Sequence, residues 1–176
     1  MPAPARFAED FSRYWGLLGL LVSSAGRRVM HPDFDAARTE ELTKGLARMC
    51  RAELARTPGT VYRLRRSTVH YRRIFTDHDV VLSPVLAHTT PEIGHLSPTL
   101  PFEELFARLQ AYVGFTPLNN AAGGPAVSLP LGRSRQGLPV GCHFSADLGD
   151  ERTLLELAYE LEQARPWARI QDVDAH

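Results

Sequence analysis

The chain has 176 residues, of which 44% are hydrophobic and 23% charged, as expected of one soluble globular domain with a sizeable core. Its 20 basic and 20 acidic residues cancel, so net charge gives no reason to expect nucleic acid or an anionic membrane as a partner. Cys50 and Cys142 have no zinc or CxxC spacing and no histidine pair has ligand spacing, so we expect no metal, no cofactor and reduced thiols in the cytoplasm.

The first predicted helix covers roughly Ala5–Val29. Its apolar run, Tyr14–Ala25, has 12 residues, which is too short to cross a bilayer. A secretion signal is the alternative, but Glu9 and Asp10 stand where such a signal carries basic residues. Apolar residues also recur at helical spacing, so the pattern favours an amphipathic helix with a wide apolar face.

Two more helices are predicted before residue 79. The second is capped by Asp33 or Asp35 and ends before Pro58–Gly59. The third covers residues 60–78, with an apolar face made by Val61, Leu64, Val69, Ile74 and Phe75. Its arginines could bind phosphate, but they point around the helix and are expected to form a solvated face: Arg63, Arg65, Arg66, Arg72 and Arg73.

The pattern changes after Asp77. A buried strand is predicted over residues 79–86, a loop up to Pro101, a short helix over 102–114, strands over 126–131 and 139–146, and a last helix that stops before Pro166. This order predicts an α/β fold. We expect a single domain over residues 1–176, in which a helical cover (1–78) packs on an α/β part (79–176).

The residues alone predict no self-contained active site. Ser128 lies in the middle of a strand with no GxSxG elbow around it. Cys142 and His143 are adjacent in a strand, so their side chains face opposite sides of the sheet and cannot pair. The stretch AAGGPA has two glycines but lacks the lysine of a phosphate-binding loop.

The second half resembles the C-terminal portion of the amidase signature family. The first part of that family's pattern is matched by Asn120, Gly123, Pro125, Ala126, Ser128 and Pro130, and the second part by Gly137, Leu138, Pro139, Val140 and Gly141. Residues 79–94 resemble the strand and proline loop that precede this pattern, and residues 150–167 resemble the closing helix. One departure is His143, where many members have Gln.

This resemblance implies a part of a mixed sheet flanked by helices, from an enzyme that hydrolyses carbon–nitrogen amide bonds through an acyl-enzyme. Such amidases carry a Ser–cis-Ser–Lys triad on a Gly/Ser-rich signature. The only lysine here is Lys44, on a predicted surface helix, and the only adjacent serines, Ser23–Ser24, have no glycine-rich run beside them. We therefore expect no catalytic residue in this chain.

Two functional interpretations follow. In the first, the chain is the C-terminal part of an amidase, inactive alone, and supplies strands and one pocket wall for a small amide substrate. Its expected partner is a catalytic N-terminal half or a second copy of itself. In the second, the chain is a stand-alone, non-catalytic binding or structural module with an amidase-derived fold.

The candidate substrate-binding residues are Thr116, Asn119, Asn120 and His143. Thr116 and Asn119 are favoured to face the substrate, because short polar side chains in an otherwise apolar turn need hydrogen-bond partners. His143, one strand away, is expected to face the same pocket. Asn120 is expected instead to satisfy backbone groups of the AAGG turn. The alternative, that all four are satisfied turn and strand residues, stays open.

Overall fold

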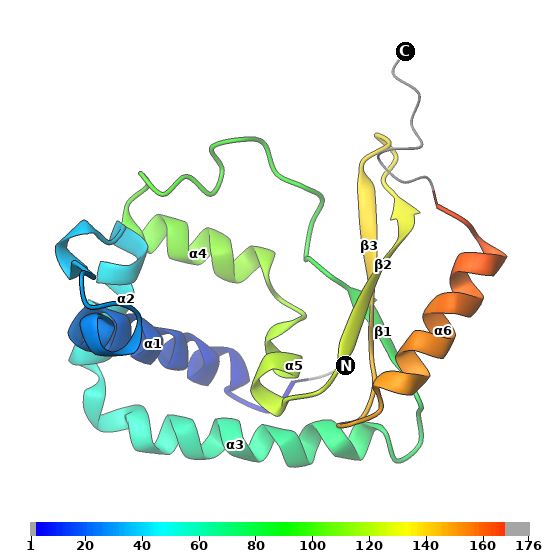
Figure 1. The fold of residues 1–176 in the computed structure, drawn as a ribbon, viewed down its shortest axis with the longest axis horizontal. Helices are drawn as coiled ribbons and strands as arrows, with labels where there is room; N and C mark the ends of the chain where they lie inside the picture. Colours follow the sequence, from blue (N-terminus) through cyan, green and yellow to red (C-terminus); the bar gives the residue numbers. More distant parts are fainter. Residues whose placement is uncertain (1–2, 168–176) are drawn as a thin grey trace.

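The computed structural model describes residues 3–167, which hold six α-helices and three strands. The helices are α1 (Phe7–Val29), α2 (Glu41–Ala52), α3 (Thr57–Ile74), α4 (Phe102–Tyr112), α5 (Pro117–Ala122) and α6 (Glu151–Ala164), and the strands are β1 (Val81–Pro84), β2 (Ala126–Arg133) and β3 (Pro139–Ser145). The predicted α/β class with a helical first half is confirmed (Figure 1).

Helices α1, α2 and α4 form one lobe, and α3 runs along its base as far as the sheet (Figure 1). Helix α1 was predicted to within two residues at its start. No helix within residues 3–167 is long and apolar enough to span a bilayer. The predicted cap Asp35 accepts a hydrogen bond from the Ala37 backbone N–H, but the turn that it caps is the short 3-10 helix Ala36–Arg38 rather than α2.

Helix α3 differs from its prediction at both its start and its buried face. Pro58 lies in its first turn, where a missing N–H costs no hydrogen bond, so Pro58–Gly59 do not separate the two helices as expected. The buried residues are Thr60, Leu64, Ser67 and Tyr71, whereas Val69 is 51% exposed. Of the predicted apolar face only Leu64 is fully buried, because polar side chains take the other buried positions.

The three strands pair antiparallel in the order β1-β3-β2. Helix α6 covers one face of this sheet, where Leu129, Phe144, Ala146 and Leu154 form a buried cluster. The strand register puts Ser83 and Ser128 opposite His143, and opposite residues share a face. This second face is therefore polar, and Cys142, which packs on the α6 side, points away from His143 as predicted.

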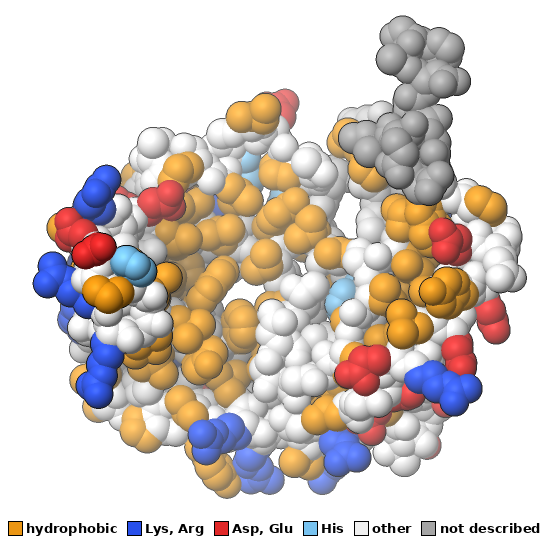
Figure 2. All heavy atoms as spheres, in the orientation of Figure 1, with side chains coloured by type: hydrophobic (Ala, Val, Ile, Leu, Met, Phe, Trp, Pro, Cys, Tyr) orange, Lys and Arg blue, Asp and Glu red, His pale blue; other side chains and the backbone are white. Residues whose placement is uncertain are grey.

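Helix α5 is a six-residue helix where only a turn was expected. Pro117 lies in its first turn, and Gly123 ends it in the left-handed conformation, with φ 77°, which glycine adopts at no steric cost. Helix α5 packs on α3 and lies between the helical lobe and the sheet (Figure 1). Figure 2 shows that hydrophobic side chains gather over α1 and α4, around a hollow in the face of the molecule that is seen in Figure 1.

Candidate functional site

A chain of buried polar side chains lies between α3, α5 and the polar face of the sheet. Asn119 Nδ2 donates to the Tyr71 hydroxyl at 3.1 Å and to Ser145 Oγ at 3.0 Å. The Tyr71 hydroxyl donates to the Ala146 carbonyl at 2.7 Å. Ser145 Oγ lies 3.4 Å from His143 Nδ1, and Ser83 Oγ lies 3.2 Å from the same nitrogen. The side chains of Tyr71, Asn119, Ser145, His143 and Ser83 are called the Tyr71–Ser83 network below.

Local sequence explains how α5 comes so close to α3. A Cβ at Gly124 would stand 2.2 Å from the Tyr71 Cζ, so only glycine lets the tyrosine ring pass under the end of α5. The Asn119 backbone carbonyl accepts hydrogen bonds from Gly123 N at 2.8 Å and from Gly124 N at 3.2 Å. The Asn-Ala-Ala-Gly-Gly stretch is therefore a helix terminus that holds Asn119 against Tyr71.

Burial sets the protonation of the network. It raises the pKa of Tyr71 to about 12, although a hydrogen bond with Ser145 opposes the rise. Burial also lowers the pKa of His143, so the imidazole is neutral at pH 7. Two hydroxyl groups lie at Nδ1, and each can either donate to this nitrogen or accept from it. The network is thus an uncharged set of oriented hydrogen-bond groups.

The contact between Ser83 and His143 is not a complete catalytic dyad. A base that activates a serine is usually held by a carboxylate at its other ring nitrogen. No Asp or Glu within residues 3–167 forms a hydrogen bond with His143, and the Ser83 hydroxyl also donates to the Pro84 carbonyl at 3.2 Å. The described residues likewise contain no group of three or more His, Cys, Asp or Glu that could hold a metal ion.

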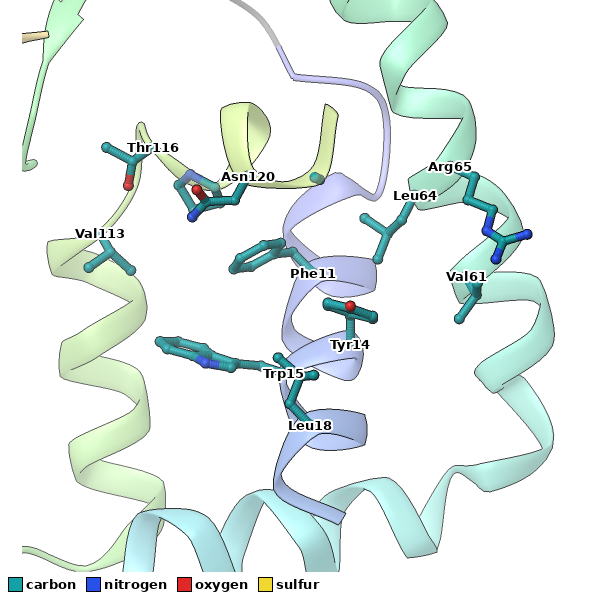
Figure 3. Close-up of a pocket in the computed structure, with 12 residues that line it drawn as sticks. Phe11, Tyr14, Trp15, Leu18, Val61, Leu64, Arg65, Val113, Thr116 and Asn120 are labelled. Atoms are coloured by element: carbon teal, nitrogen blue, oxygen red, sulfur yellow. The ribbon is translucent and has the colours of Figure 1, made fainter. Parts of the chain in front are cut away.

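A pocket of about 510 Å³, separate from this network, lies on the other side of α5 (Figure 3). The floor comes from α1, one wall from α3, and the opposite wall from the end of α4 and from α5. Twelve residues line it: Phe11, Tyr14, Trp15, Leu18, Val61, Leu64, Arg65, Val113, Thr116, Pro117, Asn120 and Ala121. Its volume lies within the roughly 300–1,000 Å³ typical of small-molecule sites.

The structure divides the four predicted site residues between these two places. Thr116 and Asn120 line the apolar pocket, whereas Asn119 and His143 are buried members of the Tyr71–Ser83 network. For the two asparagines the split has a simple cause, because consecutive residues of a helix point about 100° apart, whereas His143 lies on the polar face of β3. The expectation that His143 and Thr116 face one pocket is therefore not met by the fold of residues 3–167.

The two asparagines also exchange the positions expected for them. Asn120 is exposed, and its side chain makes no hydrogen bond with the described residues. Asn119 is the buried one, and its backbone carbonyl holds the two glycines of the turn. The prediction that Asn120 stabilises this turn was wrong, because the prediction assumed a turn and did not include helix α5.

Four important residues were missed by the sequence analysis: Tyr71, Ser83, Ser145 and Asp10. Asp10 is 2% exposed, and Arg63 donates to both of its oxygens, at 2.6 and 2.5 Å. Asp10 stands between Phe7 and Phe11 on the apolar face of α1, which was an available signal of a buried ion pair. Tyr71 and Ser145 gave no such signal, since their partners are distant in sequence.

The fold and sequence can be compared with those of known proteins. The amidase family matches residues 4–155. The chain is 50% identical over 169 residues to AmiC of Mycobacterium tuberculosis, a protein named as a putative amidase, and this match covers 96% of the chain. It is 38% identical over 96 residues, or 51% of the chain, to the 6-aminohexanoate-cyclic-dimer hydrolase of Paenarthrobacter ureafaciens, of which the match covers 19%.

Solved structures of other proteins also match the fold of this chain. A 6-aminohexanoate cyclic dimer hydrolase superposes on 94% of the chain with a TM-score of 0.74 and 25% identity. A bacterial aryl acylamidase, at 18% identity and a TM-score of 0.62 over 92% of the chain, shares the fold. The chain spans 36% of the length of AmiC and 37% of that of the hydrolase structure. The protein belongs to the amidase family.

Proposed function

We propose that the chain is the C-terminal part of an amidase that hydrolyses carbon–nitrogen amide bonds through an acyl-enzyme, and that it is inactive alone. The family match over residues 4–155 supports the amidase assignment. The sequence supports the inactivity, since its single lysine, Lys44, forms an ion pair with Glu41 on α2. The expected partner is a catalytic N-terminal part that carries the Ser–cis-Ser–Lys triad.

In this proposal the chain contributes sheet strands and one wall of the substrate pocket. The single observation that carries it is the 510 Å³ apolar pocket, which Thr116 and Asn120 border with side chains that make no hydrogen bond with the described residues. Such free polar groups at an apolar site are suited to orienting an amide. Asn119 and His143 contribute indirectly, because their network holds α5, which carries Asn120, against the sheet.

We further propose that residues 1–176 act as one domain in the cytoplasm. The hydrogen bond from Tyr71 to the Ala146 carbonyl and the one from Thr68 to the Ala122 carbonyl support this, since they tie the helical half to the α/β half. Cys50 and Cys142 are both free thiols, as is usual in a reducing compartment.

Complementation tests the proposal. The N-terminal part of AmiC, up to the point where this chain begins to match, is co-expressed with this chain, and hydrolysis of an aryl amide is measured. We expect turnover by the pair and none by either part alone, because the nucleophile and base together supply on the order of a million-fold of the rate in a comparable serine enzyme.

Two results would contradict the proposal. Turnover by the isolated chain that is lost in Ser83→Ala or Ser128→Ala would make the chain an independent hydrolase. A stable complex of the two parts that hydrolyses no amide would favour the alternative, a non-catalytic binding or structural module.

A further inference from the structure

The apolar pocket has one charged group on its border. Arg65 is the only Lys, Arg, Asp or Glu among the described residues that line the pocket. It extends from α3, on the opposite side of the pocket from Thr116 and Val113 (Figure 3). The remaining lining is aromatic and aliphatic except for Thr116 and Asn120. Figure 3 shows its guanidinium turned away from Phe11. Because Arg65 is exposed, its side chain can turn toward the edge of the pocket, where a bound molecule would meet this cation opposite two uncharged polar groups.

Arg65 also has no internal carboxylate partner. It makes no ion pair and no hydrogen bond with any residue in the described range 3–167. Two other arginines of the same helix do have carboxylate partners, since Arg63 pairs with Asp10 and Arg72 pairs with Asp147 at 3.4 Å. The positive charge of Arg65 is thus left uncompensated beside an apolar surface.

The floor of the pocket is built to accept an apolar body. Phe11 and Trp15 lie with ring centroids 6.1 Å apart, and Trp15 packs on Phe106 at 5.9 Å, so the aromatic rings are held in place. Tyr14 and Leu18, one helical turn apart on α1, remain 38% and 40% exposed. Covering such surface stabilises a complex by about 25 cal/mol for each Å² removed from water.

We propose that this pocket binds small molecules with an apolar body and a carboxylate, the carboxylate pairing with Arg65 and the apolar body lying on Phe11, Tyr14 and Trp15. Arginine suits this role, because its planar guanidinium donates two parallel hydrogen bonds to a carboxylate. This inference rests on the proposed function, and it names the substrate class: amides whose apolar part carries a carboxylate. Thr116 and Asn120 would then contact the amide group.

Direct binding to the full chain tests the ligand class without any hydrolysis. The probes are 4-phenylbutyrate and its neutral amide, 4-phenylbutanamide, titrated by calorimetry against the wild-type chain, Arg65→Gln and the control Arg51→Gln. Arg51 is an exposed arginine on α2 that does not line the pocket. Circular dichroism shows whether each variant keeps its helices, which is expected since both side chains are exposed.

We expect the wild-type chain to bind the carboxylate at least about tenfold more tightly than the amide, as one charge-assisted hydrogen-bonded pair allows. Arg65→Gln should remove this difference, and Arg51→Gln should keep it. Added salt should weaken binding of the carboxylate and leave binding of the amide unchanged.

Equal affinity of the wild-type chain for both probes, or an unchanged preference in Arg65→Gln, would overturn the assigned ligand class and leave the pocket itself in place. Binding of neither probe would overturn the pocket as a small-molecule site. The complementation assay reports separately on the proposed function, because it measures hydrolysis of an uncharged aryl amide that does not need Arg65.

Discussion

At the scale of single residues, Asn119 is the side chain on which the buried network depends. It is 6% exposed and donates to both the Tyr71 hydroxyl and Ser145 Oγ. We expect Asn119→Ala to lower the free energy of unfolding by about 1–3 kcal/mol, because two buried oxygens lose their donor. Urea denaturation followed by circular dichroism measures this loss.

The neighbouring residue is the matched control for this change. Asn120 is exposed and lines the pocket, so Asn120→Ala should change the free energy of unfolding by no more than about 0.5 kcal/mol. Equal losses in the two variants, or a larger loss in Asn120→Ala, would show that the network does not stabilise the fold.

Asn119 and Asn120 also show how much of the candidate site could be predicted from the sequence. The residue types were informative for two of the four candidates, since Asn119 and His143 form hydrogen bonds in the network. Thr116 and Asn120 line the pocket, and their side chains form no hydrogen bond with the described residues. Which asparagine was buried could not be predicted, because the six-residue helix α5 is too short to show a periodic pattern. Tyr71 and Ser145 were missed because a buried polar network depends on contacts between distant segments.

At the scale of elements, a buried ion pair joins α1 to α3. Asp10 is 2% exposed, while the Arg63 side chain is 39% exposed. Removing the arginine leaves the Asp10 carboxylate with only Thr60 and a longer contact to Arg13 at 3.8 Å, so we expect Arg63→Met to lower the free energy of unfolding by about 1.5–3 kcal/mol. The double variant Asp10→Leu/Arg63→Met should lose less, since neither charge then remains. Thermal or urea unfolding of the single and double variants compares the two losses.

This ion pair also predicts a dependence on pH. The hydrogen bonds from Arg63 lower the pKa of Asp10, against the opposing effect of burial. A carboxyl whose pKa is lower in the folded state adds stability above its unfolded pKa of about 3.9, and this contribution is lost as the pH falls toward the folded pKa. The wild-type chain should therefore lose more stability below about pH 4 than the double variant. Equal acid sensitivity would contradict this account.

Helices could be predicted from the sequence where the spacing of apolar residues continued over several turns. The 23 residues of α1 and the 14 residues of α6 show several turns of apolar spacing, and both helices were predicted. The start of α3 was wrong because Pro58–Gly59 is typical of both a helix end and a helix start. Most of its buried face was missed because Thr60, Ser67 and Tyr71 are buried through hydrogen bonds and packing, which hydrophobicity alone does not reveal.

At the scale of the whole molecule, the positions of the strands could be predicted but their pairing could not. The β2–β3 hairpin follows from two apolar runs joined by a short turn. Strand β1, however, pairs with β3, which is distant in sequence, and no local pattern specifies such a partner. The sheet therefore has β3 at its centre, with β1 and β2 each paired on one side within the described residues.

The two edges of this sheet are not equally protected. Strand β2 carries Pro130, which lacks an N–H, and its register shifts between Leu129 and Gly132, two features that discourage further pairing. Strand β1 also carries a proline, Pro84, but its pairing with β3 has no register shift, it has no charged residue, and its Leu82 is 61% exposed. An exposed apolar edge strand recruits other strands, so the β1 edge is where the isolated chain should associate with a second copy.

We therefore expect the isolated chain to dimerise through β1 as its concentration rises. Leu82→Lys places a charge on this edge and should shift the chain toward the monomer, because a strand that pairs there must leave the lysine beside an apolar surface. Tyr159→Lys is the matched control, since Tyr159 is 65% exposed on α6 and takes no part in the edge. Sedimentation velocity over a range of concentrations measures both variants. A wild-type chain that stays monomeric, or an equal effect of the two lysines, would show that β1 is not the associating surface.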